Sequence, residues 1–226
     1  MKNLKITAVI VTRKGSKRVK NKNTRLFYKK DSLLSLKIKQ LKKVKEINEI
    51  IVGSDDPKAE LIANKLKVRF CRRKKIFCDE KSASPNDMIR NMLSYFTADY
   101  VIWTHCTNPF INETAISNSI KKFFHKKKNN YDSLFCANKL TGHFYNQKTI
   151  PLNHNPRSKK HKTALSLQYL LKDNGSIFIR KFDHMKSDGN FIGQKPLVLE
   201  TTYYKGWDID TIDDFRFAKI LAKYFE

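Results

Sequence analysis

The sequence predicts a three-layer α/β domain with a mainly parallel sheet. Short apolar runs alternate along the chain with longer segments whose apolar residues recur at helical spacing. The chain has 226 residues, which is long enough for one domain with a sizeable core. Polar turns follow several of the predicted strands. Because ligands of such sheets bind at the carboxyl ends of the strands, we expect the functional site at these turns.

The expected elements follow one another in this alternation. The apolar runs predict strands at residues 6–11, 50–52, 68–71, 100–103, 133–137, 175–179 and 197–200. Helical spacing predicts helices at residues 32–45, 57–66 and 85–95, from 112 into the lysine cluster 126–128, and from about 212 onward. Pro57 and Pro85 suit the first turn of a helix, and Ser84 suits the N-cap. Acids at the start of the last helix suit the positive end of its dipole.

Residues 139–172 interrupt the alternation. They contain two prolines, many polar residues and the histidines His143, His154 and His161. We expect an excursion from the sheet, such as a hairpin with a loop, that covers a site or contacts another subunit. Residues 1–226 are otherwise interpreted as a single domain.

The formal charge of +25 fits two classes of protein. One is a non-enzymatic protein that binds RNA or another polyanion, and the other is a protein with a lysine-rich surface. The lysines are scattered along the predicted helices and loops, and no RNP, KH or zinc-finger pattern occurs. These observations favour the second class, and polyanion binding remains the alternative.

Cysteine usage and hydropathy indicate the compartment. Cys71, Cys78, Cys106 and Cys136 form no paired C-x-x-C units, so a zinc site is not expected and the thiols are expected to be reduced. No apolar stretch is long enough to cross a bilayer, and the first residues do not resemble a signal peptide. We therefore expect a cytoplasmic protein.

A basic loop at residues 13–23 follows the first predicted strand. Gly15 and Ser16 would let the backbone approach a phosphate, and Arg13 and Lys22 would neutralise its charge. The loop matches neither the Walker A sequence nor the G-x-G-x-x-G pattern. The residues alone therefore fit a phosphate-binding loop or a basic surface loop.

Two aspartates near the C-terminus form the second candidate motif. In extended backbone, Asp208 and Asp210 would point to the same side, since side chains alternate along a strand. Paired carboxylates suit Mg²⁺. Alternatively, these are solvated acids ahead of a helix that Asp210 or Thr211 caps. A phosphate-binding loop together with a distal acidic pair indicates metal-assisted phosphoryl or nucleotidyl transfer.

In this order and spacing the motifs resemble the acylneuraminate cytidylyltransferase (CMP-sialic acid synthetase) family over nearly the whole chain. The matching segments are residues 13–23, 53–56, Arg73 with residues 82–84, residues 107–109, 174–179 and 208–215. The first and last segments are the most specific. The resemblance implies a fold of the nucleotide-diphospho-sugar transferase (Rossmann-like) type with a small excursion for dimerisation or acceptor binding.

The resemblance also implies an activity and its residues. CMP would pass from CTP to an acidic sugar of sialic, legionaminic or pseudaminic type, or a divergent acceptor, with release of pyrophosphate. Arg13, Lys22 and Asp210 would be catalytic, and Asp208 and Asp210 would hold Mg²⁺. The residues expected to bind substrate are Gly15, Ser16, Asn23, Arg73, Ser84, His105, Thr107, Lys162 and Asn174. A homodimer is implied as well, and neither a membrane nor a specific nucleic acid is an expected partner.

The acceptor side departs from the family pattern. His105 stands where the family commonly has a glutamine, and residues 162–168 stand where it often reads R-T-Q-D-L-P-P. The nucleotide half matches better than the acceptor half. We therefore hypothesise a changed acceptor, such as a legionaminic- or pseudaminic-type sugar or a more distant acid.

Overall fold

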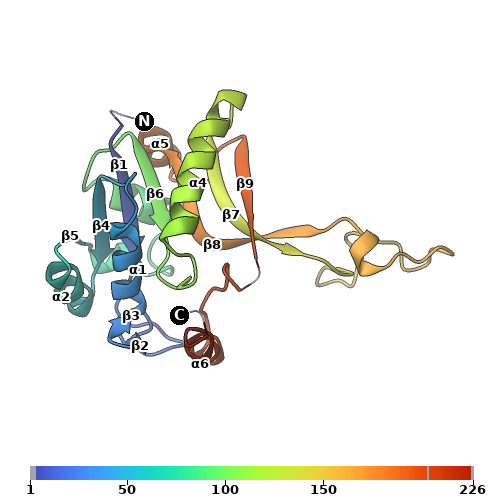
Figure 1. Cartoon of the computed structure of the whole chain (residues 1–226), viewed down its shortest axis with the longest axis horizontal. Coiled ribbons are helices and arrows are strands. Elements are labelled where there is room, and N and C mark those ends of the chain that lie inside the picture. Colours follow the sequence, from blue (N-terminus) through green and yellow to red (C-terminus); the bar gives the residue numbers. More distant parts are fainter. Residues whose placement is uncertain (1–3, 203, 225–226) are drawn as a thin grey trace.

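The computed structural model describes residues 4–202 and 204–224, so residues 1–3, 203, 225 and 226 of the predicted domain lie outside the described residues. A seven-stranded sheet with the order β5-β4-β1-β6-β8-β7-β9 forms its centre (Figure 1). The strands are β1 Ile6–Val11, β4 Glu49–Ser54, β5 Arg69–Arg72, β6 Tyr100–Thr104, β7 Ser133–Leu140, β8 Leu170–Lys181 and β9 Pro196–Thr201. The sheet confirms the predicted α/β class.

Helices cover both faces of this sheet. They are α1 Leu33–Lys42, α2 Pro57–Lys65, α3 Pro85–Leu93, α4 Glu113–Lys126, α5 Phe182–Asp188 and α6 Ile212–Leu221. Side chains of β1 alternate between the faces: Ile10 packs in the cluster that contains α1, α2, α4 and α6, and Val9 packs in the cluster that contains α3 and α5. This makes the three predicted layers. None of the helices in the described part of the chain is both long and apolar enough to cross a membrane.

The helix starts follow the predicted capping chemistry. Ser84 accepts a hydrogen bond from the backbone N–H of Asp87 at the start of α3, and Pro85 is the first residue of that helix. Thr211 caps α6 in a capping box with Asp214. Asp210 therefore precedes the cap, and its carboxylate is not used in capping.

Three features go beyond the predicted elements. A short hairpin, β2 Leu26–Tyr28 and β3 Asp31–Ser32, precedes α1, and α5 follows β8 directly. β8 pairs antiparallel with both β6 and β7, whereas the other paired strands of the sheet run parallel. The sequence pattern of a buried strand does not specify its direction, so the reversal of β8 was not predicted.

The predicted excursion is an arm that extends away from the sheet (Figure 1). β7 and β8 continue past the sheet as an antiparallel pair, in which Leu140 lies opposite Leu170. Between them lie an isolated bridge from Tyr145 to Pro151 and the short 3-10 helix Ala164–Ser166. We call residues 141–169 the arm.

Candidate active site

The turns that follow β1, β4 and β6 meet at one edge of the sheet, as predicted, because β1 pairs with both other strands. The backbone N–H of Thr12 donates to the carbonyl of Gly53 at 3.0 Å. The backbone N–H of Lys14 donates to the carboxylate of Asp55 at 2.7 Å. A cavity of about 300 Å³ opens at this edge, and we call it the nucleotide cavity after the expectation from the sequence that the basic loop binds a nucleotide.

The basic loop forms one wall of the nucleotide cavity. Gly15 has a φ of +78°, a conformation that residues with a side chain rarely adopt, and this turns the chain after β1. Gly15 does not line the cavity itself. The loop residues that do line it are Arg13, Ser16, Lys17, Arg18, Val19, Lys22 and Asn23. The loop therefore presents four cationic side chains to one space.

The segment with the two aspartates lies against the basic loop and forms the adjoining part of the wall. Ile209 is fully buried between them, and its backbone is held from two sides. Its N–H donates to the carbonyl of Thr107 at 3.0 Å, and its carbonyl accepts from Nζ of Lys22 at 2.5 Å. Asp208 and Asp210 both line the cavity, as the alternation of side chains predicted.

The two carboxylates differ in their partners. Asp210 pairs with Arg18 at 2.9 Å and lies 3.6 Å from Nζ of Lys22. Within the described residues, Asp208 has neither a hydrogen bond nor an ion pair. No cluster of three or more His, Cys, Asp or Glu side chains that would hold a metal ion occurs in residues 4–202 and 204–224. Two carboxylates fit a Mg²⁺ ion, which usually keeps water or substrate phosphate as its other ligands.

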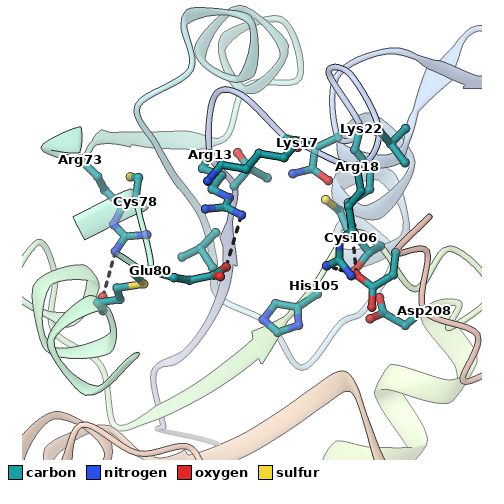
Figure 2. A pocket seen from close by; sticks show the side chains of 18 of the residues that line it. Arg13, Lys17, Arg18, Lys22, Arg73, Cys78, Glu80, His105, Cys106 and Asp208 are labelled. Carbon is teal, nitrogen blue, oxygen red and sulfur yellow. Dashed lines mark hydrogen bonds and ion pairs between the residues drawn. The ribbon is translucent and has the colours of Figure 1, made fainter. Parts of the chain in front are cut away.

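Arg13 reaches across the cavity mouth to an acidic loop. Its guanidinium lies 3.3 Å from the carboxylate of Glu80 and 4.0 Å from that of Asp79. Figure 2 shows Arg13 pointing toward Glu80, with Arg73 and Cys78 on one side and Lys22 and Asp208 on the other. Arg13, a candidate phosphate-binding side chain, is therefore paired with a carboxylate of the chain itself.

Arg73 forms the wall on the side of β5. It is 5% exposed and donates to the carbonyls of Phe77 at 2.6 Å and Met88 at 3.0 Å. Burial lowers the pKa of its guanidinium. Arg73 therefore holds the loop and helix that line the cavity. Ser84 is not among the residues that line it, and its hydroxyl is bonded to Asp87.

His105 lies between the nucleotide cavity and a second hollow of about 760 Å³ at the base of the arm. The indole N–H of Trp103 donates to Nε2 of His105 at 3.3 Å, which leaves the ring proton on Nδ1. Burial lowers the pKa of the imidazole, although Asp208 and Asp173 oppose this shift. His105 is therefore a neutral imidazole at neutral pH.

The second hollow has amide and aromatic walls, and we call it the acceptor hollow after the acceptor side expected from the sequence. Its lining includes Asn138, Asn174, Phe178, Phe191 and Trp207, and it shares Asp208 and Asp210 with the nucleotide cavity. The amide N–H groups of Asn174 donate to Asn138 at 2.9 Å and Thr201 at 2.8 Å. Asn174 therefore shapes the wall through internal hydrogen bonds.

Of the other residues singled out in the sequence, some line the cavities and some do not. Thr107 lines the nucleotide cavity. Lys162 lies on the arm, where a separate hollow includes His143, His154 and His161, and a single chain does not bring it to either cavity. Burial raises the pKa of the Cys106 thiol to about 12, so this thiol is protonated and unreactive at neutral pH.

The nucleotide cavity contains polar atoms without partners in the described part of the chain. These are the side-chain oxygens of Asn23 and Thr12, both buried. Buried polar atoms of this kind are normally hydrogen-bonded, so they indicate a polar ligand. Thr12 was not predicted, and neither were Arg18 and Glu80. Arg18 belongs to the predicted basic loop, and Glu80 stands in an otherwise lysine-rich stretch, so both had a weak signal in the sequence.

A family model described as cytidylyltransferase matches residues 7–221. The chain belongs to the cytidylyltransferase family. It is thus a nucleotidyltransferase, and the match extends from β1 through the aspartate segment to α6.

Curated relatives cover nearly the whole chain. A pseudaminic acid cytidylyltransferase of Campylobacter jejuni is 28% identical over 236 residues, which cover 99% of this chain and 97% of the relative. An N-acylneuraminate cytidylyltransferase of Escherichia coli is 28% identical over 222 residues, which cover 95% of this chain and 51% of the relative. Both are acylneuraminate-type enzymes, in agreement with the resemblance found from the motifs.

Solved structures share the fold. CMP:2-keto-3-deoxy-manno-octonic acid synthetase complexed with CTP gives a TM-score of 0.72 at 15% identity, over 97% of this chain and 99% of that chain. A 4-diphosphocytidyl-2C-methyl-D-erythritol synthase from Anaerococcus prevotii gives 0.69 at 14% identity, over 97% of this chain and 96% of that chain. This likeness confirms a nucleotidyltransferase fold of the nucleotide-diphospho-sugar, Rossmann-like type.

Proposed function

We propose that this cytidylyltransferase transfers CMP from CTP to the anomeric hydroxyl of an acidic sugar and releases pyrophosphate. One observation carries the proposal. The cationic wall of the nucleotide cavity adjoins Asp208 and Asp210, and these two residues also line the acceptor hollow. A nucleotide on one side and a sugar on the other would meet at the carboxylates.

CTP fits the nucleotide cavity by charge and by hydrogen bonding. Its triphosphate would lie against Arg13, Lys17, Arg18 and Lys22, where the positive charge of the loop offsets the negative charge of the phosphates. The unpartnered oxygen of Asn23 would accept from a polar group of the nucleotide.

The acceptor hydroxyl attacks the α-phosphorus of CTP and loses its proton to solvent water, and the bond from this phosphorus to the bridging oxygen of pyrophosphate breaks. Lys22 and Arg18 stabilise the negative charge that develops on the phosphate oxygens, because preorganised cations interact most strongly with the transition state. Asp208 and Asp210 would hold Mg²⁺, which supplies a Lewis acid for the phosphate oxygens. Neutral His105 lies where the two cavities join, and its ring, held by Trp103 and by the backbone of Gly175, would form part of the surface that positions a substrate.

The acceptor class follows from the relatives and from the departures of this chain. The curated relatives include pseudaminic acid enzymes that match over nearly their full length. His105 and residues 162–168 differ from the sialic acid pattern. The amide and aromatic walls of the acceptor hollow suit a sugar with acylamino and methyl groups. A pseudaminic-type acid is therefore the proposed acceptor.

The proposal includes a homodimer in the cytoplasm. The arm carries exposed apolar side chains away from the sheet, with Leu152 at 56% and Leu165 at 86% exposure. Such side chains suit burial against a second copy. The four cysteines are all free and buried, as expected for a reducing compartment. Light scattering of the full chain and of a Leu152→Ser, Leu165→Ser variant would measure the oligomer.

The test is pyrophosphate release from CTP, with UTP, ATP and GTP in parallel, in the presence of Mg²⁺ and a panel of acidic sugars. CTP-selective release with the pseudaminic-type acid is expected. Fast turnover of N-acetylneuraminate would contradict the acceptor assignment. Absence of both turnover and CTP binding would contradict the activity and favour binding of polyanions.

A further inference from the structure

Lys37 lies in the hydrophobic core, on the face of α1 that packs beneath the active site. Its side chain is fully buried, beside Leu34, Ile38 and Leu41. Its Nζ donates to the carbonyl of Asn108 at 3.0 Å and to that of Ile111 at 2.8 Å. No carboxylate pairs with it in the described part of the chain. Lys37 is therefore a hydrogen-bond donor to the backbone rather than half of an ion pair.

The carbonyls that Lys37 binds belong to the loop between β6 and α4. This loop turns its backbone oxygens toward α1, where no water reaches them, so the helix must supply donors. Gln40, one turn along α1, donates to the carbonyl of Pro109 at 2.8 Å. Two side chains of one helix thus bind three carbonyls of the loop, those of Asn108, Pro109 and Ile111.

The same loop holds the catalytic segment from its other side. The side-chain amide of Asn108 donates to the carbonyl of Asn174 at 2.9 Å and to that of Trp207 at 3.3 Å. The carbonyl of Thr107 accepts from the N–H of Ile209 at 3.0 Å. A continuous path of hydrogen bonds and peptide units therefore runs from Lys37 through the loop to the residue between the two aspartates.

We propose that Lys37 is a positioning residue, which fixes the loop at residues 107–111 and through it the backbone that directs Asp208 and Asp210 into the active site. The proposal rests on the proposed function, since it assigns the two aspartates to nucleotidyl transfer. Displacement of catalytic groups by about 1 Å can lower a rate about 100-fold. Loss of the Lys37 donors should therefore act on turnover before it acts on nucleotide affinity.

Lys37→Met tests this, because methionine has a similar length and no donor. The control is Lys39→Met, which removes an exposed lysine of the same helix that pairs with Asp31 at 2.7 Å. We expect kcat to fall about 30- to 100-fold in Lys37→Met, with the KM for CTP within about threefold. Lys39→Met should match the wild type. A lower melting temperature with unchanged kcat would mean that Lys37 serves stability alone and would overturn the proposal.

A second measurement does not depend on activity. Amide hydrogen exchange of Ile209 reports directly on its bond to Thr107, and the Val52 amide in the central sheet serves as the internal control. Exchange at Ile209 should rise at least about tenfold in Lys37→Met while Val52 is unchanged. Lys37→Gln, which retains one donor group, should give an intermediate value. Equal protection of Ile209 in all variants overturns the proposal.

If these variants do not fold, hydrogen exchange of the wild-type protein still tests the proposal. The Ile209 amide must then be strongly protected in the unmodified chain, and rapid exchange would refute the positioning role. The exchange data also separate the two proposals. If the wild type releases no pyrophosphate with any acceptor, the proposed function fails, whereas the exchange data still decide whether Lys37 holds the segment.

Discussion

Replacement of Asp210 by asparagine should affect binding and turnover in opposite directions. The Asp210 carboxylate pairs with Arg18 at 2.9 Å and lies 3.6 Å from Nζ of Lys22. Both cations belong to the wall proposed for the triphosphate. Without a metal ion, the carboxylate competes with the phosphates for these cations and repels the phosphates. Asp210→Asn removes the competition, so CTP should bind more tightly in EDTA.

The expected gain is small because the groups are partly solvated. Asp210 is 47% and Arg18 is 66% exposed, so the dielectric response of water weakens their interaction. A unit charge at 4 Å from another contributes about 1 kcal/mol in a water-like medium, which corresponds to about fivefold in affinity. Calorimetric titration of CTP in EDTA would measure this change.

Turnover with Mg²⁺ should fall at least about 100-fold in the same variant, because the metal loses a ligand where charge develops in the transition state. Pyrophosphate release measures it. Asp213→Asn is the matched control, since Asp213 pairs with Arg216 at 3.2 Å on the exposed start of α6 and does not line the cavity. Weaker CTP binding in EDTA, or retention of turnover, would refute the assignment of Asp210.

Three further predictions concern Glu80 and Gly206 at the site and Lys37 beneath it. Glu80→Gln should tighten CTP binding about two- to fivefold by freeing Arg13, and an unchanged Kd would show that the contact does not compete. Gly206→Ala would place a Cβ against Asn138, Asn174 and Thr201. The KM for the acceptor should therefore rise at least about tenfold while CTP binding is retained, and an unchanged KM would contradict this. Burial lowers the pKa of Lys37 to about 7. Above this pH the side chain is neutral in the folded chain but still protonated in the unfolded chain, so the free energy of unfolding rises with pH. The free energy of unfolding of the wild type minus that of Lys37→Met should therefore rise from pH 7 to 8.5, by at most about 1.4 kcal/mol per pH unit, in urea titrations. Cys106, which faces Lys37, remains protonated over this range, and a flat difference would contradict the shift.

Much of the fold was predictable because its signals are local. Buried strands such as residues 6–11 are continuous apolar runs, and Ser84 and Thr211 precede helices as capping residues do. The hairpin at residues 26–32 and the seven-residue α5 are too short to produce a periodic pattern. The direction of β8 depends on the length and path of the arm that precedes it, and the apolar pattern of the strand is the same in either direction.

The site divides in the same way between local and long-range signals. The basic loop and the aspartate pair could be found because each is a compact motif whose residue types match its chemistry. Glu80 gave only a weak signal and Lys37 gave none, since their partners are distant in sequence: Glu80 pairs with Arg13, and Lys37 donates to carbonyls beyond β6. In the sequence, Lys37 is one more lysine of a strongly basic chain. Only its burial against backbone oxygens distinguishes it from the solvated lysines of the same helix, such as Lys39. Composition and motif spacing therefore miss buried donors that bind loop carbonyls, and in a lysine-rich chain burial is the property that identifies them.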